Sequence, residues 1–304
     1  MPTTLRRLKL TDHAEVTKLC GTLEDHDYVP DVFPEWAKSK DSVPIGVFEK
    51  DELVAITTLN LIPGSHIAWV HGLRVKAGHH RQGLGLTVVS HIIGLAKGKG
   101  VTALWYSTGN RNEASMGLAR KAGFTLVDTV GTFRIEKPFP PHPKPSPVIL
   151  PLSVSPDRLE EILMANPELV ETNTLPFSWD FDFKTRDGLR RLGAQTDFNV
   201  MIGDEGQCTG LFYGKTFQRN DMKIMTFSVF STDQAMFIDI IARALDTLEG
   251  SGSDRGVFFV RPRTKPWAVS LGVVPDEYLD TSYHLFQLDP QKTASKGRTS
   301  PEFR

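Results

Sequence analysis

The sequence predicts a mixed α+β fold organised in two domains, and three observations support this prediction. An apolar, β-branched segment over residues 67–75 runs through a glycine-containing loop into a segment with helical spacing over residues 86–95. A strand-like segment follows at residues 101–107, so that strand, helix and strand form a parallel crossover. A proline-rich segment at residues 138–151 then separates this half from a second half in which strand and helix patterns return in a similar order.

The first elements are predicted from alternation and capping. Residues 5–10 alternate apolar and basic side chains, as a half-buried strand does. Thr11 and Asp12 can cap the helix that follows, which we expect to end near Gly21. The next segment is rich in acidic and aromatic residues and is interrupted by prolines, so we expect an irregular loop and then a short helix around residues 35–38.

The remaining elements of the first half follow from residue type and length. Two β-rich segments, at residues 45–49 and 53–61, are joined by an acidic turn and predict an antiparallel hairpin. The helix after the glycine loop is expected over residues 86–97, where it ends at a glycine-rich turn. A strand near residues 125–135 closes this half.

Composition places the chain among ordinary globular proteins. It has 304 residues, of which 40% are hydrophobic and 23% charged, and a formal net charge of -1. This charge gives no general attraction to nucleic acid or to an anionic membrane. The two cysteines, Cys20 and Cys208, lack the spacing of a zinc site or a disulfide framework, which favours a reducing, cytoplasmic location and no metal. No apolar run reaches the length of about 18 residues that a membrane span needs, and the first residues do not resemble a secretion signal.

The loop between the central strand and its helix contains the sequence H-R-Q-G-L-G. Gly83 and Gly85 lack Cβ, so the backbone can turn tightly and bring successive N–H groups close to an anion. The positive end of the helix dipole lies at the same place and favours a pyrophosphate. The dinucleotide motif G-x-G-x-x-G and the P-loop ending G-K-[ST] both fail to match. A plain strand-to-helix turn would carry the same glycines. The flanking sequence is therefore needed to distinguish a pyrophosphate-binding loop from an ordinary turn.

The flanking sequence resembles motif A of the GCN5-related N-acetyltransferase (GNAT) superfamily, usually V-x-P-x-x-[RQ]-x-x-G-x-[GA]. The matching positions are Val75, Ala77, His80, Gly83 and Gly85, so alanine replaces the usual proline and histidine the usual Arg or Gln. The resemblance implies that this loop binds the pyrophosphate of acetyl-CoA. The cofactor-binding residues assigned on this basis are Leu73, Val75, His80, Arg81, Gln82, Gly83, Leu84, Gly85 and Leu86.

A later segment resembles motif B of the same superfamily, commonly N-x-x-A-x-x-L-Y-x-K-x-G-F. The matching positions are Asn112, Ser115, Leu118, Lys121, Gly123 and Phe124. Two motifs in the right order imply the GNAT acyl-CoA acyltransferase fold, with a mixed sheet, for residues 1–137. Asn112 either bonds the pantetheine arm of the cofactor or caps the helix. The tyrosine that usually protonates the thiolate in this superfamily falls at Ala119.

The second half predicts helices and meander strands without a glycine loop. We expect helices at residues 155–164, 185–192 and 237–248, and strands at residues 198–202, 209–216, 222–229, 256–260 and 283–288. At the corresponding place in the second half, between the strand at residues 222–229 and the helix at residues 237–248, the chain has Asp233 and no glycine. Residues 152–290 are therefore interpreted as a degenerate GNAT-like domain that shapes the substrate side, with an unrelated α+β domain as the alternative. Residues 138–151 are the linker and residues 291–304 a disordered tail, and a fragment ending near Pro141 is expected to keep cofactor binding.

The resemblance can be narrowed to the histidine N-acetyltransferase group and its probable N-acetyltransferase relatives. The sequences D-Y-V-P and W-A within residues 27–37, G-L-R-V in motif A and a C-terminal domain of similar size carry this resemblance. It implies that the acceptor is a free amino acid such as histidine. The residue before G-L-R-V is usually Glu in that group, whereas here it is His71.

The chemistry of acyl transfer suggests the catalytic candidates. Attack on a thioester needs a neutral amine and a stabilised carbonyl oxygen. His71 lies on the strand just before the predicted pyrophosphate loop, and histidine titrates near the working pH, so we predict that it is the general base; a buried structural histidine is the alternative. Tyr28 is the second candidate, for lining the site or relaying a proton, although a tyrosine beside prolines often only packs.

Two other functions stay open. A protein or peptide N-acetyltransferase would need an acidic groove, and the acidic residues Glu24, Asp25 and Asp27 favour it. A CoA-binding regulatory module without turnover is favoured by the departures from the motifs at His80 and Ala119.

Overall fold

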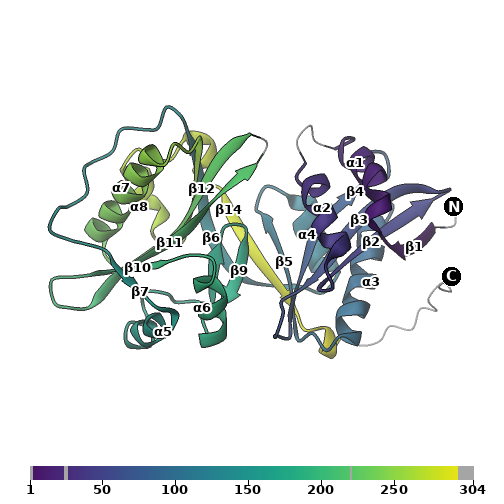
Figure 1. Cartoon of the computed structure of the whole chain (residues 1–304), viewed down its shortest axis with the longest axis horizontal. Helices are drawn as coiled ribbons and strands as arrows, with labels where there is room; N and C mark the ends of the chain where they lie inside the picture. Colours follow the sequence, from purple (N-terminus) through teal and green to yellow (C-terminus); the bar gives the residue numbers. More distant parts are fainter. Residues whose placement is uncertain (1–2, 24–26, 220, 294–304) are drawn as a thin grey trace. The chain divides into compact units, whose positions relative to one another are not determined.

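The computed structural model describes residues 3–23, 27–219 and 221–293 and shows a mixed α+β chain that divides into two compact units (Figure 1). Unit 1 consists of residues Met1–Thr108, Asn112–Val127 and Leu285–Arg304, and unit 2 of residues Gly109–Arg111 and Asp128–His284. Two strands, β6 (Thr125–Glu136) and β14 (Ser282–Leu288), each begin in one unit and end in the other. The unit boundaries therefore differ from the predicted ranges 1–137 and 152–290.

Unit 1 follows the predicted order of elements. Its strands are β1 (Thr3–Arg7), β2 (Ser42–Glu49), β3 (Glu52–Leu61), β4 (Ile67–Val75) and β5 (Ala103–Gly109), and its helices are α1 (His13–Cys20), α2 (Val29–Lys38), α3 (Leu84–Gly98) and α4 (Glu113–Lys121). The strands lie in the sheet in chain order, antiparallel up to β4 and parallel between β4 and β5. The predicted hairpin, central strand and crossover are thus confirmed.

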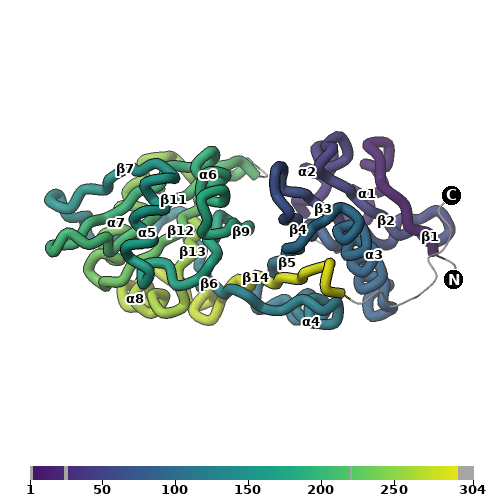
Figure 2. The backbone as a smooth tube through the Cα atoms, turned by 90° about the horizontal axis from the view of Figure 1, so that it is seen from below, coloured from purple at the N-terminus to yellow at the C-terminus, as the bar shows by residue number. Residues whose placement is uncertain are grey.

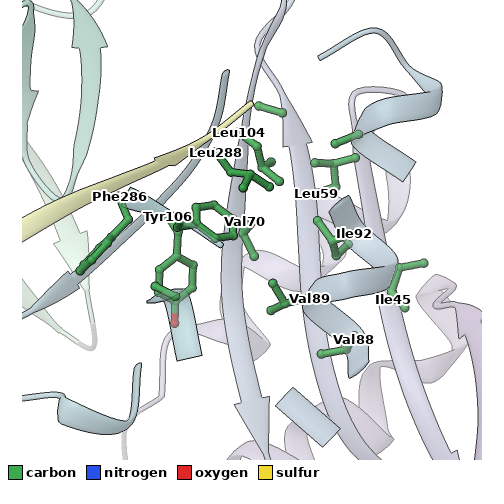
Figure 3. Packing of buried hydrophobic residues seen from close by; sticks show 14 of the residues in the cluster. Ile45, Leu59, Val70, Val88, Val89, Ile92, Leu104, Tyr106, Phe286 and Leu288 are labelled. Atoms are coloured by element: carbon green, nitrogen blue, oxygen red, sulfur yellow. The ribbon is translucent and has the colours of Figure 1, made fainter. Parts of the chain in front are cut away.

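Helix α3 lies on one face of this sheet and helices α1 and α2 on the other (Figure 2), and an apolar cluster fills the space under each. On one face α3 buries Val88, Ile92 and Ala96, spaced by four residues so that they lie along one side of the helix. These side chains pack against the strands, as Figure 3 shows for Val88 and Ile92. On the other face α1 and α2 bury Val16 and Phe33 against β2 and β3. Both faces of the central strands are therefore dry, which fits their nearly continuous apolar sequences.

The end of β14 belongs to the core of unit 1. Phe286 and Leu288 are buried among the side chains that pack under α3 (Figure 3). The Trp105 indole donates a hydrogen bond to the Gln287 side chain over 2.8 Å. Beyond the strand, Gln291 bonds the backbone oxygens of Lys97 and Val101. Residues 291–293 are thus ordered against α3, contrary to the predicted tail, and residues 294–304 lie outside the described residues.

Unit 2 repeats a strand–helix–strand crossover within a separate set of strands. Its elements are β7 (Leu152–Val154), α5 (Pro156–Ala165), β8 (Thr174–Phe177), β9 (Asp180–Phe183), α6 (Arg186–Gly193), β10 (Phe198–Ile202), β11 (Cys208–Arg219), β12 (Met222–Ser231), α7 (Gln234–Gly250), β13 (Arg255–Val260) and α8 (Lys265–Ser270). The order in the sheet is β6-β13-β12-β11-β10-β7, with β8 and β9 forming a separate hairpin. The strand β12 is parallel to β13, as β4 is to β5.

Several predicted boundaries were wrong for identifiable reasons. The helix expected at residues 35–38 begins at Val29, because Pro30 occupies the first turn, where its missing N–H costs nothing. The short elements β7, β8, β9 and α8 were not predicted, since three to six residues carry too little periodicity. The linker has no helix or strand over residues 138–151, as expected, and Arg243 of α7 donates hydrogen bonds to two of its backbone oxygens. In the described part of the chain, every helix is too short or too polar to cross a bilayer.

Candidate functional site

Two parallel strands of unit 1 separate in the middle of the sheet. The pairing of β4 with β5 runs from Ile67 opposite Ala103 to Trp69 opposite Trp105. It therefore covers three residues of a nine-residue strand and a seven-residue strand. Past these tryptophans, each strand continues without a further described pair to the other. We call this place the strand split.

A bulge in β4 coincides with the strand split. Between the pairs Thr58–His71 and Ile56–Arg74, β4 advances three residues while β3 advances two. Gly72 lies in this bulge with a φ of +63°, and a Cβ there would lie 2.7 Å from the tryptophan ring of α2. Glycine is therefore required at this position for two reasons: the backbone is left-handed, and the tryptophan ring lies too close for a side chain.

Six successive N–H groups, from Arg81 to Leu86, have no acceptor among the described residues. They open α3, whose first N–H groups cannot bond within the helix, and no side chain caps it. Arg81 and Gly83 both have left-handed backbones, with φ of +63° and +82°, which turns neighbouring N–H groups toward one side. A Cβ on Gly83 would meet nothing within 4 Å. This open row of donors at a helix N-terminus fits a pyrophosphate.

Two side chains of the same loop bond to backbone oxygens within it or at the end of β4. His80 Nε2 lies 2.9 Å from the backbone oxygen of Val75, and the Gln82 amide donates to the backbone oxygen of Gly78 over 3.2 Å. The Arg81 side chain is exposed. The backbone N–H groups of the loop and the exposed Arg81 side chain are thus the groups that an anion would contact.

The apolar residues predicted for the cofactor form the walls beneath the loop. Leu84 is buried, and Leu73 and Val75 are partly buried against the core under α3. Leu86 is half-buried at the first turn of α3. A Cβ on Gly85 would lie 3.6 Å from Leu118 of α4, which is an ordinary van der Waals contact, so Gly85 faces α4. The structure brings all these residues together around the start of α3.

His71 lies at the strand split on β4. Its Nδ1 is 2.9 Å from the side-chain nitrogen of Asn60, and its ring stacks on Trp69 at a centroid distance of 5.2 Å. The backbone oxygen of His71 accepts a hydrogen bond from Thr57 over 3.0 Å. These contacts fix the imidazole on the face of the sheet opposite α3, because Val70 before it packs under α3.

Two polar oxygens near His71 have no hydrogen-bond partner among the described residues. They are Oγ1 of Thr58, directly opposite His71 on β3, and Oδ1 of Asn60. Both atoms are buried, and buried polar atoms in folded proteins are almost always paired. This part of the site therefore suits a ligand that donates hydrogen bonds. Sequence reasoning missed both residues, since only the register of β3 against β4 brings them to His71.

Tyr28 belongs to a buried charged group at the start of α2. Arg74 pairs with Asp27 through two hydrogen bonds of 2.5 and 2.8 Å, and its guanidinium lies 5.4 Å from the centre of the Tyr28 ring. Burial alone would raise the pKa of Asp27, but the hydrogen bonds from Arg74 and the Val29 N–H lower it below its usual value. Burial also raises the pKa of Cys20 to about 12, which makes this thiol a poor nucleophile. Glu24 and Asp25 lie outside the described residues.

The start of α4 supplies a second set of polar contacts. Asn112 caps the helix by accepting a hydrogen bond from the Ser115 N–H over 3.0 Å, so the capping role is confirmed. The Ser115 hydroxyl lies 2.5 Å from the hydroxyl of Tyr106, on β5. Ala119 is buried, one turn further along α4. Neither Arg74 nor Tyr106 was identified from the sequence, because neither falls in a position that local patterns single out.

Comparisons with known proteins agree with this geometry. Residues 10–124 match the model of the acetyltransferase (GNAT) family. A GCN5-related N-acetyltransferase from Sphaerobacter thermophilus aligns over 95% of this chain and 96% of its own, with a TM-score of 0.62 and 14% identity. A tandem GNAT protein from the clavulanic acid biosynthesis pathway aligns over 96% of this chain and 100% of its own, with a TM-score of 0.59 and 12% identity. Among curated proteins none matches significantly. The fold is thus the GNAT fold, with a second GNAT-like domain.

Proposed function

We propose, on the premise that residues 10–124 form an acetyltransferase domain of the GNAT family, that this chain acetylates the amino group of a small molecule. Acetyl-CoA is the acetyl donor of this family. The favoured acceptor is a free amino acid such as histidine, and the favoured location is the cytoplasm. The observation that carries the proposal is the row of six N–H groups from Arg81 to Leu86 beside the strand split.

His71 is the proposed general base. It lies at the strand split and is fixed by its contacts with Asn60 and Trp69. A neutral imidazole that removes the proton of the attacking amine would make the nitrogen lone pair available to the thioester carbon. Tyr28, stacked near Arg74 at the start of α2, is proposed to line the acceptor side.

The unpaired oxygens of β3 support a small amine as acceptor. An amine or ammonium group donates up to three hydrogen bonds, and Oγ1 of Thr58 and Oδ1 of Asn60 can accept two of them beside His71. Asp27, by contrast, is already paired with Arg74 and is not available to a basic peptide. This reduces the support for a protein or peptide acetyltransferase, which remains the second candidate.

A thiol-release assay tests the proposal most simply. Purified full-length protein is incubated with acetyl-CoA and each free amino acid in turn, and with a panel of short peptides. We expect free CoA to appear with one or a few amino acids, and the acetylated product to be identified by mass spectrometry. Turnover with peptides alone would replace the small-molecule proposal by its alternative. Binding of acetyl-CoA without release for any acceptor would favour the non-catalytic module.

A further inference from the structure

Three side chains of unit 2 converge outside the residues proposed for acetyl transfer. His142 comes from the linker, and Asp246 and Glu249 come from α7, where a spacing of three residues places them on the same side of the helix. One atom of each, a ring nitrogen or a carboxylate oxygen, lies within 4.8 Å of the other two. An imidazole and carboxylates are ligands that zinc takes in proteins.

The linker is fixed along α7, which holds His142 in place. Arg243 of α7 donates hydrogen bonds to the backbone oxygens of Ser146 and Ile149. The Ser146 N–H in turn donates to the carboxylate of Asp239, also on α7. The His142 side chain is only 5% exposed. The imidazole is therefore positioned by the packing around it before any ligand binds.

The contacts of His142 turn a lone pair toward Asp246. Nδ1 lies 3.3 Å from the backbone oxygen of Pro140, and because a carbonyl oxygen only accepts hydrogen bonds, Nδ1 carries a proton. In a neutral ring Nε2 is then an acceptor, and it lies 3.0 Å from a carboxylate oxygen of Asp246, which is also an acceptor. Two acceptors at this distance repel each other unless they share a cation, which is either a proton or a metal ion. A hydrogen bond from the other ring nitrogen to a backbone oxygen is what orients histidine ligands in metal sites.

The charge of the cluster favours a metal ion over a proton. A proton on His142 balances Asp246 alone, whereas the carboxylate of Glu249 has neither an ion pair nor a hydrogen bond within the described part of the chain. The last turn of α7 has no basic residue, and the end of the helix dipole there is negative. Lys144 Nζ lies 3.7 Å from Asp246, but its side chain is 86% exposed and can move away at little cost. Glu249 is exposed and gives an ion a path from solvent.

We propose that His142, Asp246 and Glu249 bind a zinc ion through Nε2 of the imidazole and one oxygen of each carboxylate, with water as the fourth ligand. The ion fastens the start of the linker to the last turns of α7. This site does not depend on the proposed acetyl transfer, since none of its three ligands belongs to unit 1.

Calorimetric titration of the full-length protein with Zn²⁺ at pH 7.5, after treatment with a chelator, tests the site. We expect one Zn²⁺ per chain and a higher midpoint of thermal unfolding in its presence. Mg²⁺ should produce neither effect, because it prefers oxygen ligands to an imidazole. His142→Gln and Glu249→Gln should each weaken Zn²⁺ binding by at least about 10-fold. Since Glu249 is exposed, its substitution keeps the fold, so the test does not rest on the linker variant alone.

Glu205→Gln is the matched control. It also removes the charge of an exposed glutamate of unit 2, but in the turn between β10 and β11 and outside the cluster, so Zn²⁺ affinity should not change. Lys144→Met removes the cation that competes for Asp246 and should strengthen Zn²⁺ binding. A wild-type protein that does not bind Zn²⁺ would show that His142 and Asp246 share only a proton and would overturn the inference. An unchanged affinity in His142→Gln, or an equal loss in Glu249→Gln and Glu205→Gln, would overturn it as well.

Discussion

In each unit a central strand leads into a helix, α3 in unit 1 and α7 in unit 2, but the two helices begin differently. The loop before α3 and the first turn of this helix leave six N–H groups, from Arg81 to Leu86, without acceptors among the described residues. The first turn of α7 is closed by Asp233, whose carboxylate accepts a hydrogen bond from the Met236 N–H over 2.7 Å. A carboxylate at this place both fills the donor site and repels a phosphate.

The parallel strands beside these helices also differ between the units, since they separate in unit 1 and stay paired in unit 2. In unit 1, β4 and β5 pair over residues 67–69 and 103–105 and then separate. In unit 2, β12 and β13 pair without interruption from Ile224 opposite Arg255 to Val229 opposite Val260. A cofactor arm that reaches the middle of the sheet needs separated strands. Unit 2 therefore lacks both features of the proposed cofactor site, because its helix is capped by a carboxylate and its parallel strands stay paired.

The largest expected effect comes from separating the units at the linker. A fragment of residues 1–141 lacks Phe286 and Leu288, which are buried in the core of unit 1. Removing two large buried side chains together with their strand costs more than the stability of an ordinary domain, so the fragment should not fold. Circular dichroism and thermal unfolding check this. A cooperative transition in the fragment would contradict the assignment of β14 to unit 1 and restore the sequence-based expectation that residues 1–141 bind the cofactor alone.

The next effect concerns the buried pair of Arg74 and Asp27. In Arg74→Met the carboxylate stays buried without its ion-pair partner and keeps only the hydrogen bond from the Val29 N–H, which should cost about 3–5 kcal/mol in the free energy of unfolding at pH 7. In the wild type the lowered pKa of Asp27 gives stability above the carboxyl's unfolded pKa, and this is lost only as the pH falls through the folded value. In the variant the unpaired carboxyl prefers to be protonated, so the difference between the two proteins should shrink toward pH 4.

Urea unfolding at pH 7 and pH 4 measures this difference. The double variant Asp27→Leu with Arg74→Met removes both charges and should recover most of the loss. A loss that is the same at both pH values would show that the charge of Asp27 is not its cause.

His71→Gln should lower kcat by roughly 10²-fold at pH 7 with little change in acetyl-CoA affinity, because it removes a base and keeps a polar side chain of similar size. The defect should become smaller as the pH rises through the pKa of the acceptor amine, since more amine then arrives neutral. Steady-state kinetics between pH 6 and pH 9 provide the measurement. Near-normal kcat over this range would make His71 a structural residue.

The smallest effect is expected from Asp233→Gly in unit 2. Loss of the cap bond to Met236 should cost only a few tenths of a kcal/mol of stability, because glycine is itself a tolerated N-cap residue. The variant should still bind acetyl-CoA at one site per chain, because the closed pairing of β12 with β13 is unchanged. Calorimetric titration gives the stoichiometry. A second site would show that the cap alone keeps unit 2 from binding the cofactor.

Local patterns predicted much of this fold but only part of the site. The strand at residues 67–75 and the helix after it have long, periodic apolar sequences, and the glycines between them are adjacent in the chain. Thr58, Asn60 and Arg74 meet His71 or Tyr28 only through the register of β3 with β4 and the bulge at Gly72. That register depends on tertiary packing, which a single sequence does not display. For the same reason the place of β14 in unit 1 could not be foreseen.

The central claim, that the loop before α3 holds the cofactor, is tested most directly by comparing two glycine variants. Gly83 and Gly206 have nearly the same φ, +82° and +83°, and a Cβ on either meets nothing within 4 Å. Gly83→Asp and Gly206→Asp therefore introduce the same backbone strain and the same charge, one at the start of α3 and one in a turn of unit 2. Thermal unfolding is followed with and without acetyl-CoA. The account predicts that acetyl-CoA stabilises the wild type and Gly206→Asp but no longer stabilises Gly83→Asp, and equal stabilisation of both variants would contradict it.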